Sequence, residues 1–121
     1  MKLHEYPEQI ESAALQLHEA SEQLQAAREQ LGHIEIQIKA DVIAAKDEGT
    51  GKALYSNDTA REIATGQRLE QSAPYAEGRE RERQLEKTKA EQTARLERLR
   101  REFQLALIDY EAERLGRRHA A

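Results

Sequence analysis

The chain has 121 residues, of which 35% are charged and only 4% aromatic, and its mean hydropathy is −0.91. This composition is poor in large apolar side chains for a compact globule, and the absence of cysteine excludes disulfides and thiol chemistry. No apolar run approaches the ~20 residues of a membrane span. The net charge of −4 disfavours broad affinity for nucleic acid, which needs a basic surface. We expect one soluble, cytoplasmic domain over residues 1–121, with no membrane association.

Charge and apolar spacing divide the chain into two long arms around a middle segment. Residues 1–48 carry four basic and ten acidic side chains, whereas residues 75–121 carry twelve and ten. Leu, Ile and Ala recur in both arms at helical spacing, and the chain has only two prolines. The different charges of two arms of similar length favour their pairing. We therefore predict an all-α fold, a long antiparallel helical hairpin (coiled coil) with a short helix at the elbow, residues 47–75.

The first arm is predicted to be a helix over about residues 8–47. Pro7 suits the first turn of a helix, where its missing N–H costs nothing. Apolar residues follow a heptad over five repeats, as the a and d positions of a coiled coil require. They form two rows, which are Leu3, Ile10, Leu17, Leu24, Leu31, Ile38 and Ala45, and Tyr6, Ala13, Ala20, Ala27 and Ile34. The second row continues to Asp41, which we expect to pair with Arg79 or Arg81, or to fix the register.

The elbow is predicted to contain a turn followed by a helix over about residues 58–71. Gly49 and Gly51 suit the end of the first helix, and the run Ser56-Asn57-Asp58 offers N-caps for the next one. The Ala73-Pro74 step either ends this helix or kinks a continuous one. We expect the elbow helix to cover the apolar residues that widen the end of the first arm, which are Ile36, Val42 and Ile43.

The run GTGK in the elbow invites comparison with a phosphate-binding loop. That loop needs four residues between its glycines and a Ser or Thr after the lysine, but here Lys52 is followed by Ala53. We interpret the run as a flexible turn.

The second arm is predicted to be a helix over about residues 75–116. Its apolar row is partly polar in its first half and comprises Leu85, Lys89, Gln92, Leu96, Leu99, Phe103, Ala106 and Tyr110. From residue 103 to 115 the apolar residues cover more than one face, whereas a surface helix normally has one stripe. We therefore expect Phe103, Leu107, Ile108 and Leu115 to form an oligomer surface, in a homodimer that is a four-helix bundle. A monomeric, elongated hairpin is the alternative.

The register of the two arms depends on which apolar residues face each other. Pairing over the full length of the arms places Leu17 opposite Phe103 and Leu24 opposite Leu96. Both rows repeat every seven residues, so that sliding one heptad keeps an apolar match. A shorter pairing, with a kinked helix through Pro74, would leave the apolar end of the second arm free for a partner chain.

Residues that could carry chemistry are sparse. The four histidines, His4, His18, His33 and His119, form no pair at i,i+3 or i,i+4, which disfavours a metal site. The sequence suggests no Ser/His/Asp set, and a helical hairpin offers no evident pocket. We expect no enzymatic activity, no cofactor and no metal.

A basic run in the second arm is a candidate nucleic-acid face. It contains Arg95, Arg98 and Arg101, with Glu97 and Glu102 interleaved, and these carboxylates weaken its field. An ordinary solvated helix face is the competing interpretation.

Residues 34–115 carry a set of motifs in order. The elbow contains Gly51-Lys52, then Tyr55-Ser56-Asn57, then Arg61-Glu62, with Tyr75 after the short helix. The second arm contains the run LERLRREF at residues 96–103. This stretch resembles a family of small helical proteins that recur in bacterial phages, mobile elements and some bacterial genomes. The resemblance implies no catalytic or binding residues, and its genetic setting implies a role near DNA replication or recombination.

These features indicate a non-enzymatic helical interaction or scaffold protein that acts as a homo-oligomer. The resemblance implies an origin in phages or mobile elements. Another protein could bind at the elbow, through Lys52, Tyr55, Asn57 and Arg61, or at the apolar end, residues 103–115. The alternative function is that of an accessory factor in DNA replication or recombination, which contacts nucleic acid through the arginines of residues 95–101.

Overall fold

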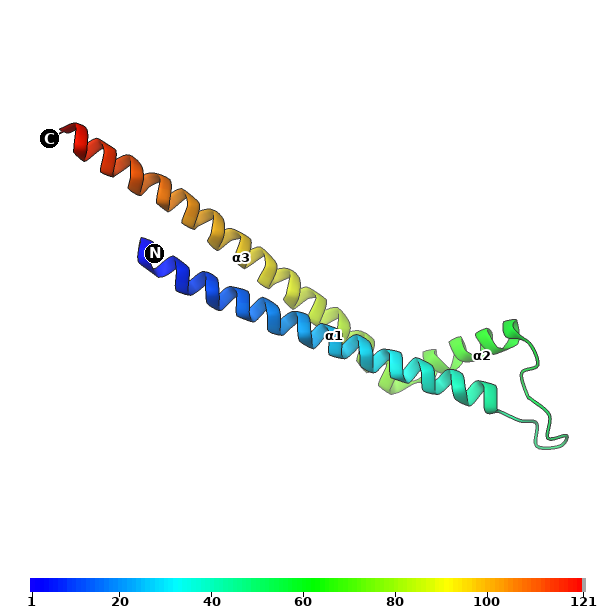
Figure 1. The fold of residues 1–121 in the computed structure, drawn as a ribbon. Helices are drawn as coiled ribbons and strands as arrows, with labels where there is room; N and C mark the ends of the chain where they lie inside the picture. The colour runs from blue at the N-terminus through cyan, green and yellow to red at the C-terminus, as the bar shows by residue number, and fades with distance from the viewer. Residues whose placement is uncertain (121) are drawn as a thin grey trace. The chain divides into compact units, whose positions relative to one another are not determined.

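The computed structural model describes the backbone of residues 1–120 and the side chains of residues 1–117. A 3-10 turn, η1 (Leu3–Glu5), leads into three helices, α1 (Tyr6–Ala44), α2 (Asp58–Gln71) and α3 (Ala73–Ala120) (Figure 1). Residues 1–120 contain no β-strand, so that the predicted all-α class is confirmed. Among the helices described here, none combines the length and apolarity that a membrane span requires.

The chain divides into two compact units. The first consists of Met1–Glu22 with Glu86–Ala121, and the second of Gln23–Leu85. Helices α1 and α3 each contribute to both units, whereas α2 belongs to the second unit alone.

In the first unit, the start of α1 packs antiparallel to the second half of α3. The rings of Tyr6 and Phe103 lie 5.5 Å apart between centroids. Further along, the fully buried Ala13 forms a cluster with Leu96 and Leu99. The small side chain of Ala13 lets the two helices approach closely, and burial of the leucines supplies the main stabilisation, about 1.5–3 kcal/mol for each side chain.

The contacts correct the predicted register. Phe103 lies against Tyr6 and not opposite Leu17, and Leu96 clusters with Ala13 and not with Leu24. An interhelical hydrogen bond supports this register, because Arg95 Nη1 donates to Gln16 Oε1 at 2.6 Å. As a result α3 continues past the ring of Tyr6, as far as Ala120.

In the second unit, the rest of α1 packs against the start of α3. Leu24, Ala27 and Leu85 form a buried cluster. Beside them the Arg28 guanidinium donates through Nε to Glu82 Oε2 at 3.2 Å. The apolar rows predicted for α1 are therefore buried or half-buried as far as Ile38.

Gly78 of α3 lies close to α1 in this unit. A Cβ at this position would lie 2.7 Å from Cδ2 and 3.4 Å from Cγ of the buried Leu31. We expect Gly78→Ala to lower the free energy of unfolding by about 1–2 kcal/mol, because overpacking outweighs the gain of up to ~1 kcal/mol in helix propensity. The control is Gly32→Ala, since a Cβ on Gly32 meets nothing within 4 Å. Urea unfolding should show the control to be neutral or stabilised, and equal effects at both sites would contradict the close contact.

The first helix ends at Ala44, three residues before the predicted position, because a tight turn begins at once. Asp47 N donates to Lys52 O at 2.8 Å, and Asp47 Oδ1 accepts from the amides of Gly49 and Thr50 at 2.8 and 3.1 Å. Gly51 has φ +69°, a left-handed conformation that glycine adopts without strain. The GTGK run is thus held by hydrogen bonds.

The interpretation of Asp41 as a partner of Arg79 or Arg81 was wrong. Asp41 is exposed and accepts a hydrogen bond from Gln37 Nε2 at 3.0 Å, while Arg79 pairs with Glu82. The neighbouring residue Val42 is buried instead, with 1% of its surface exposed.

The elbow helix α2 has the predicted bounds and is separate from α3. Ser72 between them is extended (φ −82°, ψ 113°), and its Oγ accepts from Tyr75 N at 3.2 Å. Pro74 then lies in the first turn of α3, where the missing N–H costs nothing. Of the two interpretations of Pro74, the break is the one observed.

Candidate functional site

The elbow residues proposed as contacts mainly hold their own segment together. Asn57 Oδ1 caps α2 by accepting from Ala60 N at 2.8 Å. Arg61 donates through Nε to Tyr55 O at 3.3 Å and through Nη1 to Asp58 Oδ1 at 3.3 Å. Three of the four candidates therefore meet around the start of α2, and their groups fix where that helix begins.

Lys52, the fourth candidate, is exposed and lies in the turn that precedes this cluster. Its backbone carbonyl closes the turn by accepting from Asp47. Among the described residues, the side chain of Lys52 makes no hydrogen bond or ion pair with Asn57 or Arg61.

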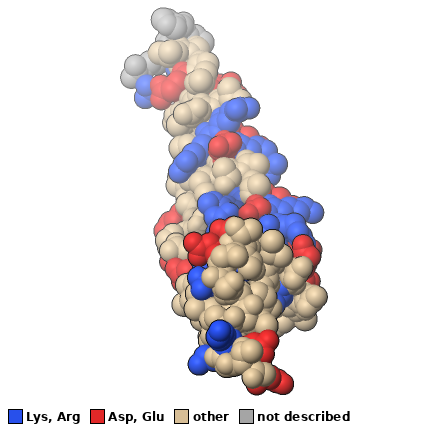
Figure 2. Space-filling model, turned by 90° about the vertical axis from the view of Figure 1, so that its right-hand side faces the viewer, with Lys and Arg blue, Asp and Glu red and all other residues tan. Residues whose placement is uncertain are grey.

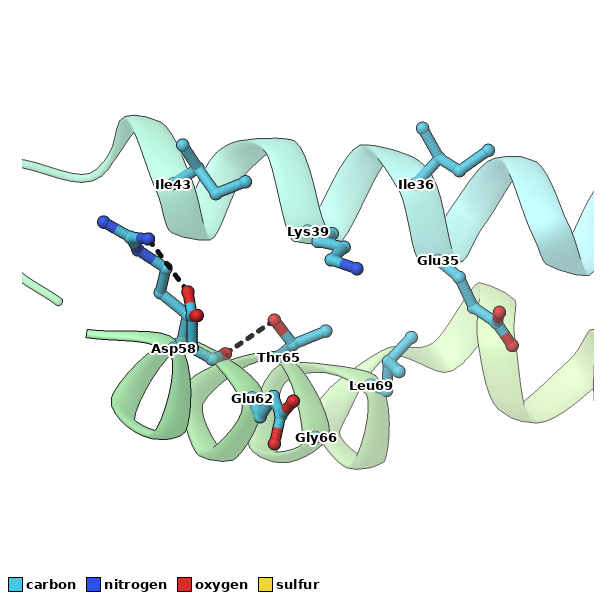
Figure 3. Close-up of a pocket in the computed structure, with 10 residues that line it drawn as sticks. Glu35, Ile36, Lys39, Ile43, Asp58, Glu62, Thr65, Gly66 and Leu69 are labelled. Carbon is cyan, nitrogen blue, oxygen red and sulfur yellow. Dashed lines mark hydrogen bonds and ion pairs between the residues drawn. The ribbon is translucent and has the colours of Figure 1, made fainter. Parts of the chain in front are cut away.

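A groove of about 640 Å³ runs between α1 and α2, within the second unit. Its lining residues come from both helices and are Glu35, Ile36, Lys39, Ile43, Asp58, Arg61, Glu62, Thr65, Gly66 and Leu69. Figure 3 shows Lys39 and Leu69 between the two helices, with Ile36 and Ile43 along the α1 side and Glu62 and Gly66 along the α2 side. The groove therefore combines an apolar surface with three carboxylates and two cations.

The expectation that α2 covers the widened apolar end of α1 needs a correction. Val42 is buried, but Ile36 and Ile43 remain exposed. Both isoleucines lie on the same side of α1 as Lys39, since their spacings of three, four and seven residues repeat one helix face. The heptad spacing of Ile36 and Ile43, outside the two predicted rows, was the sequence signal for this second face.

One phenol and one carboxylate meet at the border of α1 and α3 in the second unit. Tyr75 donates through its hydroxyl to Glu35 Oε1 at 3.2 Å. Partial burial, followed by the hydrogen bond to Glu35, raises the pKa of Tyr75 above its usual value. The phenol of tyrosine is neutral at ordinary pH without any shift, and here it donates to a carboxylate that lines the groove.

The arginines of the candidate nucleic-acid face are not equivalent. Arg95 is half-buried and donates to Gln16, whereas Arg98 and Arg101 are exposed and have no ion pair among the described side chains. Figure 2 shows that on the face drawn there Lys and Arg side chains alternate with Asp and Glu side chains. The structure thus leaves two of the three candidates accessible, with Glu97 and Glu102 next to them in the sequence.

The candidate oligomer surface also divides into two parts. Phe103 is half-buried against Tyr6 of the same chain. Leu107, Ile108 and Leu115 are exposed. Leu105, which was not among the candidates, is exposed as well and lies three residues before Ile108.

The histidines show no metal-binding arrangement in the part of the chain that is described. His18 pairs with Glu22 at 2.9 Å, and residues 1–117 contain no group of three His, Cys, Asp or Glu side chains that could hold a metal ion. His119 lies outside the residues whose side chains are described.

The chain matches no protein-family model, no curated protein and no solved structure.

Proposed function

We propose that the chain is a non-enzymatic helical interaction protein that acts as a homo-oligomer, with a dimer as the expected state. The observation that carries this proposal is an apolar stripe on α3, formed by Leu105, Ile108, Ala112 and Leu115. We call it the outer stripe. The exposed fractions of its three large side chains are 56%, 63% and 48%.

The outer stripe lies on the side of α3 opposite the row that packs against α1. Leu99, Phe103 and Ala106 form the inward row of α3 in the first unit. At 3.6 residues per turn, the outer stripe points about 180° away from that row. Its spacing of three, four and three residues is that of the a and d positions of a helix that packs against another helix. Neighbouring exposed apolar residues of this kind mark interaction surfaces in soluble proteins.

Ile108→Glu tests this proposal by placing a carboxylate at the most exposed of the three large side chains of the stripe. We expect the wild-type chain to have the mass of an oligomer in light scattering at high micromolar concentration, and the variant to have the mass of a monomer. Leu15→Glu is the matched control, because Leu15 of α1 is 60% exposed and stands outside the stripe. A wild-type chain that stays monomeric at high micromolar concentration would refute the proposal.

A second candidate function, contact with nucleic acid during DNA replication or recombination, is favoured by the two accessible arginines. Arg98 and Arg101 are exposed and are not neutralised by an ion pair among the described side chains. Guanidinium groups of this kind bind phosphates, and such binding weakens steeply with salt. The genetic setting implied by the family resemblance points in the same direction.

The test of this second function is binding to single- and double-stranded DNA across a salt series. Arg98→Ala with Arg101→Ala should reduce both the affinity and the salt slope. The control is Arg114→Ala with Arg117→Ala, which removes the same charge from arginines that already pair with Glu111 and Glu113. Absence of binding at low salt would exclude this function.

A further inference from the structure

The groove between α1 and α2 and the outer stripe of α3 are two apolar surfaces that no part of the described chain covers. We propose that they bind each other between copies, so that the outer stripe of one copy lies in the α1–α2 groove of another. This inference rests on the proposed homo-oligomer and names the surface that receives the stripe.

The shapes of the two surfaces are complementary. The groove lies between two helices, and a third helix packs into such a space by placing a row of side chains along it. The outer stripe is a row of this kind, with apolar side chains at a and d spacing. Gly66 gives room for it, because a Cβ on Gly66 would meet nothing within 4 Å.

One charge on each surface has a counterpart on the other. Lys39 is an exposed cation on the same helix face as Ile36 and Ile43, and no ion pair joins it to a described side chain. A partner that pairs with Lys39 therefore needs apolar residues with a carboxylate next to them. The outer stripe offers this combination, because Asp109, adjacent to Ile108, is exposed and has no ion pair with a described side chain.

Pairing of the outer stripe with its own copy is less favourable. In a parallel pair, Arg98 and Arg101, which continue the a and d spacing of the stripe, would each face the same arginine of the partner. In an antiparallel pair centred on the stripe, the carboxylates of Asp109 and Glu111 from both copies would gather near the two-fold axis. Like charges facing each other across an interface are destabilising. The groove offers these carboxylates a cation, Lys39, beside its own carboxylates, of which Glu35 already accepts a hydrogen bond from Tyr75.

The experiment uses the full chain with a bulky cation in the groove, Gly66→Arg. Arginine favours helix and the position has open space, so the variant should keep the helical content of the wild type by circular dichroism. We expect its dissociation constant, measured by sedimentation, to rise at least about tenfold. Gln67→Arg is the control, because it adds the same charge to the exposed side of α2 next to the groove lining and should leave the constant unchanged.

Mixing two defective variants tests whether the stripe and the groove are partners. Ile108→Glu has a damaged stripe and an intact groove, whereas Gly66→Arg has the reverse. If the stripe binds the groove, the mixture retains one intact contact and forms a heterodimer although each variant alone is monomeric. Charge reversal gives a second test, in which Lys39→Glu and Asp109→Lys each weaken assembly about fivefold and together restore it.

The outcomes separate this inference from the proposed function. If Gly66→Arg assembles as the wild type does while Ile108→Glu is monomeric, the stripe pairs elsewhere and the groove contact is wrong, but the homo-oligomer stands. If both variants are monomeric and their mixture stays monomeric, the stripe and groove are not partners. If the wild type itself is monomeric, both proposals fail.

Discussion

Replacement of Leu96 by alanine should lower the free energy of unfolding by about 2–5 kcal/mol, the range for deleting a large buried aliphatic side chain. Leu96 is buried in the cluster with Ala13 and Leu99, and this cluster is the core of the first unit. The loss combines the transfer of apolar surface to water with the cavity left between α1 and α3. A two-helix contact has few other apolar residues that could compensate.

Urea unfolding followed by circular dichroism measures this effect. Both variants are compared at one protein concentration, because the apparent stability of any self-associating protein depends on concentration. Leu15→Ala is the matched control, since it removes the same atoms from an exposed leucine of α1 and should change stability by no more than about 0.5 kcal/mol. Similar losses from the two variants would mean that the cluster around Ala13 does not stabilise the fold.

The buried side of α1 could be predicted from the sequence because the heptad records which residues face a partner helix. Ala13, Ala20, Leu24, Ala27 and Leu31 are all buried, as that spacing indicates. The bounds of α2 were predictable for a similar reason, since the capping residue Asn57 has a local signature. Both results depend on short-range chemistry that can be recognised in one segment of chain.

The register was not predictable because it depends on contacts between distant segments. Any shift by seven residues keeps apolar residues opposite each other, so that periodicity alone leaves several pairings open. Steric fit is one factor that distinguishes them. The observed register places Gly78 against Leu31, where even one methyl group would be too close. Gly78 alone did not indicate this contact in the sequence, because Gly32, Gly66 and Gly116 also lie in helices and a Cβ on each would meet nothing within 4 Å.

The candidate groove shows a second reason why the structure could not be predicted fully from the sequence. The sequence showed that Ile36 and Ile43 add apolar surface beyond one stripe, and α2 was expected to cover it. Val42 is buried, but the two isoleucines stay exposed beside the fourteen residues of α2. How far one helix shields another depends on the tilt and separation of their axes, which the apolar pattern of either helix does not contain.

A strict heptad predicts that residue 41 is buried, whereas the buried residue is Val42, and this difference has a geometric cause. A straight α-helix falls behind a seven-residue repeat by about 20° per heptad. Five heptads separate Tyr6 from Asp41, so the accumulated lag is about 100°, which is one residue of helix. The row that begins at Tyr6 and Ala13 therefore ends at Val42, and Asp41 turns outward to accept from Gln37.

Val42→Asp should consequently lower the free energy of unfolding by about 3 kcal/mol or more, because it removes a buried apolar side chain and buries a carboxyl group without a partner. Burial raises the pKa of the introduced carboxyl in the folded chain above its unfolded value. Since protonation then favours the folded state, the deficit relative to the wild type should shrink as the pH falls below that raised pKa.

Asp41→Val is the companion variant, because it moves the apolar side chain to the position that a strict heptad would bury. Asp41 is exposed, so this change should alter stability by only about 0.5 kcal/mol. Urea unfolding of both variants at neutral and mildly acidic pH shows which of the two positions is buried. If Asp41→Val proved the more damaging of the two, α1 would keep the strict repeat, and the lag of a straight helix could not explain why Val42 is buried.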